Sequence, residues 1–157
     1  MIDNQRLLDT FLKYVRIDSE STHEAIFASH VATDLKAIGC QVEFDDSCSA
    51  TGSDCGNLYA VLPGNMDGEP IIFSAHMDTV APGIGVEPVI ENGVIRSQGN
   101  TILGGDDKSG IVAVVEVLRT IVDNNLPHPT IQAVFTVCEE TGLHGSAAID
   151  YCKLVAK

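Results

Sequence analysis

Apolar residues recur at helical spacing near the start of the chain. Residues 4–16 carry five of them on one side: Leu7, Leu8, Phe11, Leu12 and Val15. This pattern predicts an amphipathic helix. Ser21 and Glu24 have the spacing of a capping box, which predicts a second helix that runs to about Ile38 and ends at Gly39.

Shorter apolar or alternating runs predict strands further along the chain. These strands cover residues 41–45, 57–62, 70–75 and 130–137. The pair Asn92-Gly93 predicts a hairpin over residues 89–95, and the polar stretch 46–56 predicts a loop. Helical patterns return at 108–124 and at 145–155. Elements in this order predict an α/β fold, with a mixed, largely parallel sheet flanked by helices.

Charge narrows the range of partners. The 157 residues carry a formal net charge of −13, with 22 acidic and 9 basic side chains. Such a chain repels phosphate backbones and anionic lipids, which argues against nucleic acid and membrane partners. The sequence has no run of about 18 apolar residues that could span a bilayer. Its five cysteines include no C-x-x-C pair, which fits a reduced, cytoplasmic protein.

Three short acidic clusters carry the candidate chemistry. In the first, His76 and Asp78 follow an apolar strand and stand two residues apart, so both side chains face the same way on extended backbone. The imidazole could bind a metal through one nitrogen and donate to the carboxylate through the other. An ordinary surface histidine and aspartate would give the same pattern.

The second cluster, Asp106-Asp107, opens a predicted helix, and the third, Glu139-Glu140, ends a predicted strand. One aspartate suffices as a helix N-cap, which leaves the other free to bridge two cations. Adjacent glutamates diverge, so one could coordinate a metal while its neighbour acts as general base on a metal-bound water. When each cluster is taken alone, helix capping and a solvated strand end are the simpler explanations.

Together the clusters point to one edge of the sheet. If the strands that precede His76 and Glu139 are parallel, both end at the edge where open α/β sheets bind ligands. One imidazole with several carboxylates, and no thiolate pair, suits zinc, with manganese or cobalt as alternatives.

Three sequence motifs in one order resemble the co-catalytic zinc peptidases related to peptidase T, the tripeptide aminopeptidase. They are Ser74-Ala-His76-Met-Asp78-Thr-Val80, Gly104-Gly-Asp106-Asp107-Lys108-Ser-Gly110 and Glu139-Glu140-Thr-Gly-Leu143. The opening Phe11-Leu-Lys-Tyr-Val-Arg-Ile-Asp-Ser19 also resembles the first helix of that family. The resemblance covers nearly the whole chain.

This resemblance implies a role for each candidate residue and a short peptide as substrate. His76 would bind one zinc ion, Glu140 would bind a second, and Asp106 would bridge the two. Glu139 would be the general base for a zinc-bound hydroxide that attacks the peptide carbonyl. Asp78 would orient His76, and the peptide bond after Asp106 would be cis.

Members of the family are much longer than this chain. After the Glu-Glu motif they supply another Asp ligand, a lid or dimerisation domain and a His ligand. We therefore expect residues 1–157 to be the N-terminal portion of the catalytic domain, which alone binds metal weakly and hydrolyses little. The resemblance also allows the full-length protein to form a homodimer. An N-acyl amino acid amidohydrolase, a carboxypeptidase and a truncated, non-catalytic product remain alternatives.

Overall fold

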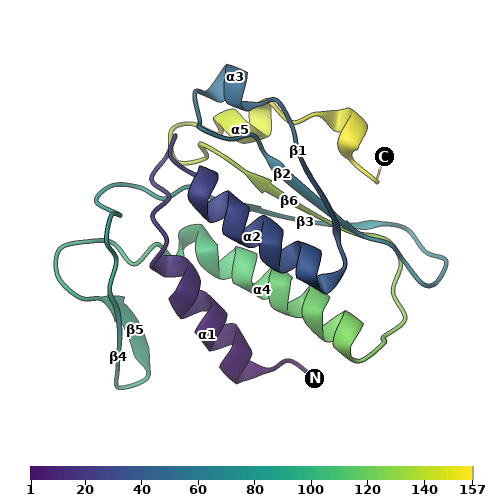
Figure 1. Ribbon diagram of the computed structural model, residues 1–157, viewed down its shortest axis with the longest axis horizontal. Coiled ribbons are helices and arrows are strands. Elements are labelled where there is room, and N and C mark those ends of the chain that lie inside the picture. Colours follow the sequence, from purple (N-terminus) through teal and green to yellow (C-terminus); the bar gives the residue numbers. More distant parts are fainter. Residues whose placement is uncertain (157) are drawn as a thin grey trace.

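The structure is a computed structural model that describes residues 1–156. The predicted N-terminal catalytic portion, residues 1–157, includes one further residue, which lies outside the described residues. Its main helices are α1 (Asn4–Val15), α2 (Ala25–Ile38) and α4 (Gly105–Asp123) (Figure 1). Shorter turns are α3 (Cys48–Thr51), α5 (His144–Ala147) and the 3-10 turn η1 (Tyr151–Lys153). The strands are β1 (Gln41–Phe44), β2 (Leu58–Leu62), β3 (Ile71–His76), β4 (Pro88–Glu91), β5 (Val94–Ser97) and β6 (Ile131–Thr136).

A four-stranded sheet has the order β1–β2–β6–β3. Strands β3 and β6 run parallel, whereas the β1–β2 and β2–β6 pairs are antiparallel. Strands β4 and β5 form the separate hairpin that the sequence predicts. Its turn residues Asn92 and Gly93 have φ angles of 52° and 78°, as a type I′ turn requires.

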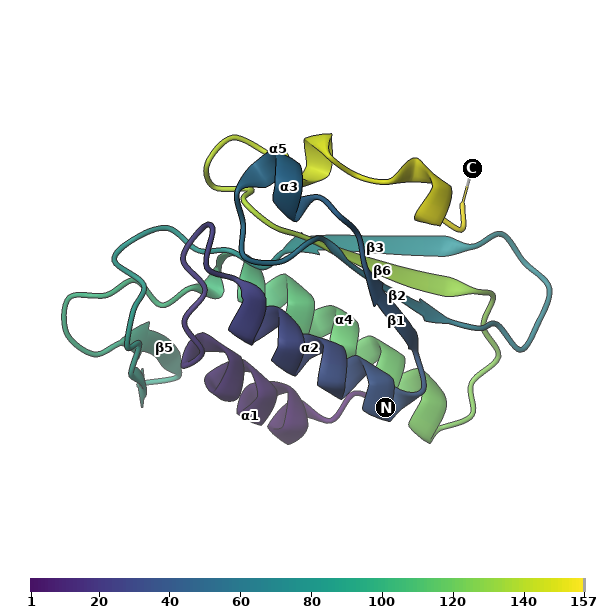
Figure 2. The ribbon, with the colours of Figure 1, turned by 45° about the horizontal axis from the view of Figure 1, so that its top comes forward.

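Helices cover one face of the sheet. Figure 2 shows α1, α2 and α4 on one side and the C-terminal segment with α5 and η1 on the other. Between helices and sheet lie fully buried apolar side chains: Phe27, Leu35, Leu58, Ile111, Leu118 and Phe135. Every residue of β6 is buried, because this inner strand is covered on both faces. On the C-terminal side, the Gln132 amide donates to the carbonyl of Lys153 and accepts from the main-chain N–H of Val155.

The expected mixed α/β class with flanking helices is confirmed. Parallel pairing is less frequent than expected, because among the strands within residues 1–156 it joins only β3 to β6. That connection contains α4, the kind of crossover that parallel neighbours need. Strands β1 and β2 are instead joined by a short segment around α3, which reverses the chain direction.

Three local expectations are wrong. No capping box forms at α2, whose N-cap residue Glu24 makes no side-chain bond to its own helix. Residues 145–155 do not form one helix, because the main-chain N–H of Asp150 donates to the Tyr59 hydroxyl and ties the segment to the sheet between α5 and η1. The predicted loop 46–56 contains the helical turn α3.

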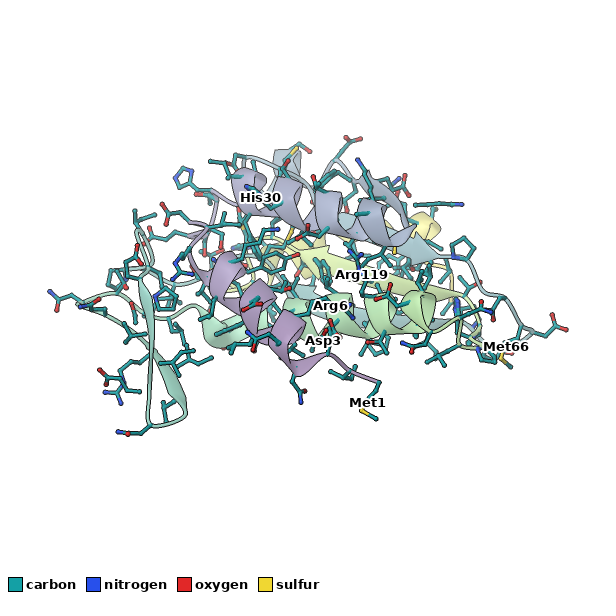
Figure 3. The ribbon with its side chains drawn as sticks, turned by 60° about the horizontal axis from the view of Figure 1, so that its bottom comes forward. Met1, Asp3, Arg6, His30, Met66 and Arg119 are labelled. Atoms are coloured by element: carbon teal, nitrogen blue, oxygen red, sulfur yellow. The ribbon has the colours of Figure 1, made fainter. Side chains whose placement is uncertain are left out.

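A buried carboxylate ties α1 to α4. Glu116 on α4 is 3% exposed and accepts from the main-chain N–H of Asp3 at 2.9 Å, from Arg6 Nε at 2.7 Å and from the Thr120 hydroxyl at 3.1 Å. Figure 3 shows Asp3 and Arg6 where α1 lies against α4. The hydrogen bond from Arg6 holds the pKa of Glu116 below its usual value. This contact fixes the first helix on the layer that also carries the second acidic cluster.

The structure also bears on the expectations about membrane spans and cysteines. Among residues 1–156, no helix combines the length and the apolar character that a membrane crossing needs. All five cysteines are free thiols, and Cys40 and Cys138 are buried.

Candidate active site

The sheet brings the first and third acidic clusters to one edge. His76 is the last residue of β3 and lies opposite Thr136, the last residue of the parallel strand β6. Glu139 and Glu140 follow shortly after β6, beyond Val137 and Cys138. The parallel pairing on which the shared edge depends is therefore present, and this edge is where open α/β sheets bind ligands.

The His76 ring is buried and contacts acidic residues through both nitrogens. Its Nδ1 lies 2.9 Å from the main-chain oxygen of Asp78 and 3.4 Å from Oδ1 of the same residue. Its Nε2 lies 3.1 Å from Asp106 Oδ1 and 3.8 Å from Glu139 Oε2. Asp78 thus engages one ring nitrogen, which leaves the other directed at the second and third clusters.

The two aspartates of the second cluster face different partners. Asp107 accepts from the main-chain N–H of Gly110 at 3.1 Å, as a helix cap does. A Cβ at Gly110 would crowd the same carboxylate, so a larger residue there would displace the Asp107 side chain. Asp106 does not cap the helix; its side chain is 86% exposed and reaches His76. The peptide bond between the two aspartates is cis, as the family resemblance implies.

Asp78 also holds the third cluster in place. It is completely buried, and it accepts from the main-chain N–H of Glu139 at 2.9 Å and of Glu140 at 3.1 Å. The Ser21 hydroxyl donates to it at 2.7 Å. Burial opposes ionisation of Asp78, but the hydrogen bonds from His76, Ser21 and the two amides hold its pKa below the usual value. One carboxylate thus joins the first cluster to the third.

The three predicted metal ligands come together. A nitrogen of His76 and carboxylate oxygens of Asp106 and Glu140 lie within 4.8 Å of one another. Burial raises the pKa of Glu140; His76 lowers it, and the charges of Asp106 and Glu139 raise it further. A divalent cation between these oxygens would relieve the repulsion, and an imidazole with carboxylates is a donor set that zinc accepts. The residues present therefore fit a metal ion.

Metal binding at this cluster is expected to release a proton. Burial alone would lower the pKa of His76, but the hydrogen bonds and charges of Asp78 and Asp106 raise it to about 9. In the metal-free protein the imidazole therefore carries, at neutral pH, a proton that a metal ion must displace. We expect the apparent zinc affinity to rise about tenfold per pH unit below this pKa and to level off above it.

Calorimetric titration with buffered zinc, in buffers of different ionisation enthalpy, measures the released protons directly. His76→Ala is the control, because it keeps the carboxylates but has no imidazole to deprotonate. A wild-type affinity that stays constant between about pH 6 and 8 would contradict the expected linkage.

Lys108 is a buried residue near the site that the sequence patterns did not single out. It is 2% exposed, its Nζ donates to the carbonyl of Ile17 at 2.6 Å, and it lies 4.7 Å from the centroid of the Phe27 ring. Burial lowers its pKa to about 8. The sequence does contain an indication that Lys108 is buried, because it lies on the apolar face of its helix with Ile111 and Val115. Its ammonium ties the start of α4 to the segment after α1.

Comparison with known proteins identifies the family. The model of Peptidase family M28 matches residues 57–152, which are more than half of the chain and contain all three acidic clusters. The chain belongs to this family. The M28 match begins at Asn57, so the segment that supplies Ser21 lies outside it.

Several relatives of this M28 chain are similar over most of its length. Peptidase T from Shewanella pealeana is 32% identical over 181 residues, which cover 88% of this chain and 43% of the relative. The crystal structures of aminopeptidase PepT from Bacillus cereus and of a tripeptidase from Staphylococcus aureus are 41% and 39% identical, each with a TM-score of 0.96 over 99% of this chain. The resemblance to peptidase T is thus confirmed. The chain spans 42% of the length of each of these two structures.

Proposed function

We propose that the full-length protein is a zinc-dependent peptidase that removes the N-terminal residue from short peptides, tripeptides above all. The observation that carries the proposal is the meeting of His76, Asp106 and Glu140 within 4.8 Å, with Glu139 beside them. The names of two relatives, a tripeptidase and an aminopeptidase, support the substrate class. Residues 1–157 would form the N-terminal portion of the catalytic domain.

His76, Asp106 and Glu140 would hold the metal. The exposed carboxylate of Asp106 has two oxygens, which suits it to bridge two zinc ions. When bound, the ions supply Lewis acidity that polarises the substrate carbonyl and lowers the pKa of water. Asp78 accepts from Nδ1 of His76, so that Nε2 remains the nitrogen available for coordination.

Glu139 would be the general base. Its Oε2 lies 3.8 Å from His76 Nε2, so its carboxylate lies beside the proposed metal ligands. Glu139 would take a proton from the attacking water as the new C–O bond forms. It would then pass this proton to the leaving amine as the C–N bond breaks, which regenerates the carboxylate.

The proposal also covers the cellular location and the partners of the full-length protein. The free thiols of the five cysteines suit a reducing compartment, which supports a cytoplasmic location. The excess of acidic side chains argues against nucleic acid as a partner. For the full-length protein we propose a homodimer on the basis of the family resemblance alone.

A substrate panel tests this function. The full-length protein, loaded with zinc, is given trialanine, its N-acetyl derivative and an N-acetyl amino acid. We expect it to release the N-terminal residue of the free tripeptide at least about a hundredfold faster than it cleaves either blocked substrate. Preferred cleavage of the N-acetyl amino acid would indicate an amidohydrolase. Release of the C-terminal residue from the blocked tripeptide would indicate a carboxypeptidase, and no cleavage of any substrate would reject a peptidase.

A further inference from the structure

Main-chain amides hold the turn that carries Glu139 and Glu140. The N–H of Val137 donates to Asn57 Oδ1 at 3.1 Å, and the N–H of Cys138 donates to Glu24 Oε1 at 3.0 Å. The next two amides donate to the carboxylate of Asp78, as described above. Along a regular strand, successive amides point to alternate sides. Here four consecutive amides each find a buried side-chain oxygen, so side chains from three other segments define the path of the turn.

Of the two carboxylates among these acceptors, Glu24 is the one that lies outside the acidic clusters. It is completely buried, and its carboxyl group is hydrogen-bonded to the main-chain N–H of Thr22 at 3.1 Å, to the Ser53 hydroxyl, and to the N–H and thiol of Cys138. The Ser53 oxygen accepts from the main-chain N–H of Cys55, which leaves its hydroxyl proton for Glu24. Four donors therefore surround one carboxyl group, and both of its oxygens serve as acceptors.

Backbone conformation points to the same residue. Thr22 and Cys138 have φ angles of 75° and 51°, in a left-handed region that residues other than glycine rarely adopt. Glu24 accepts the main-chain N–H of both. Cys138 directly precedes Glu139, so its conformation sets the direction in which the following two glutamates leave the sheet. The Glu24 carboxylate therefore stabilises the turn at the point where the chain departs from strand geometry.

We propose that Glu24 is a positioning residue for the Glu139–Glu140 pair and acts through the Cys138 amide. It does not touch the metal-binding atoms, so its effect reaches them through the backbone. A displacement of about 1 Å at a catalytic group can lower the rate about a hundredfold. The effect on the turn is independent of the reaction, whereas the effect on catalysis rests on the proposed function.

Two variants of Glu24 separate hydrogen bonding from volume. Glu24→Gln keeps an oxygen that can accept from Cys138, whereas Glu24→Leu has a similar volume and no acceptor. Glu116→Leu is the matched control, because Glu116 is also buried and also accepts a main-chain N–H, that of Asp3. It stands about 12 Å along α4 from Lys108, the first residue after the non-helical Asp106 and Asp107, at the usual helical rise. All three are made in the full-length protein.

Hydrogen exchange is measured on the metal-free proteins and tripeptide kinetics on the zinc-loaded ones. In Glu24→Leu we expect exchange of the amides in residues 137–142 to be at least about tenfold faster, and kcat to fall about 10- to 100-fold with KM within about threefold. In Glu24→Gln both changes should stay within about threefold. Glu116→Leu should accelerate exchange in α1 and leave residues 137–142 and kcat as in the wild type.

Either of two results would overturn the proposal. One is wild-type exchange of residues 137–142 in Glu24→Leu; the other is equally faster exchange in every segment, which would show only a loss of global stability. If Glu24→Leu does not fold, Ser53→Ala takes its place, because it removes one donor to Glu24. Unchanged exchange of residues 137–142 in that variant would also overturn the proposal. If the wild-type protein cleaves no peptide, the proposed function fails, and exchange alone decides the role of Glu24.

Discussion

Replacement of Glu139 by glutamine is expected to lower kcat of the full-length protein for a tripeptide about a thousandfold or more. Glutamine keeps the shape of the side chain but cannot take a proton from water. The Glu139 side chain is 33% exposed and lies 3.8 Å from His76 Nε2, so the change does not disturb the core. KM and the zinc content should therefore stay within about twofold of the wild-type values.

Steady-state kinetics together with metal analysis separate loss of the base from loss of the metal. Glu69→Gln is the matched control, because Glu69 is exposed in the connection between β2 and β3, and we expect it to behave as the wild type. A Glu139→Gln enzyme that binds zinc and keeps the wild-type kcat would exclude this residue as the base.

The second large effect is expected at Asp106. In Asp106→Ala, bound zinc should be lost and kcat/KM should fall more than about a thousandfold, because metal catalysis depends on a fixed coordination geometry. Asp106 Oδ1 lies 3.1 Å from His76 Nε2, closer than Glu139 Oε2, which lies 3.8 Å from the same nitrogen. The variant should fold normally, since the Asp106 side chain is 86% exposed.

The neighbouring aspartate supplies a control for this prediction. Asp107 caps α4 by accepting from Gly110, and asparagine serves nearly as well as a cap. Asp107→Asn should therefore keep its zinc when Asp106→Ala loses it, as metal analysis of the two purified proteins would show. The opposite result, with zinc lost only in Asp107→Asn, would exchange the roles assigned to the two aspartates.

Elements with a clear apolar period were predictable from the sequence. Helix α1 and strands β3 and β6 occur within a residue or two of the predicted bounds, because their apolar faces are the ones that the core buries. The C-terminal segment was not predictable in this way. Its path depends on hydrogen bonds to Gln132 and Tyr59, residues far away in the sequence whose partners no local pattern specifies.

In the candidate site, too, features set by local sequence patterns were predictable, and features set by contacts between distant segments were not. The three acidic clusters taken together, with the family resemblance, predicted that His76, Asp78 and Asp106 are neighbours, and the structure brings them together. Ser21 and Glu24 were misinterpreted, although their spacing is that of a capping box. The Ser21 hydroxyl donates to Asp78 and Glu24 accepts from Cys138, because buried polar groups from distant segments compete with the local cap. Such competition becomes visible only in three dimensions.

Metal removal and return tests the central claim, metal-dependent peptide hydrolysis at the His76 cluster, most directly. The full-length wild-type protein and the His76→Ala variant are stripped with a chelator, and zinc is added back stepwise while tripeptide hydrolysis and bound metal are measured. We predict that hydrolysis by the wild type stops on stripping and returns in proportion to bound zinc, and that His76→Ala recovers neither. Undiminished hydrolysis by the metal-free wild type, or full recovery in His76→Ala, would contradict the assignment of the site.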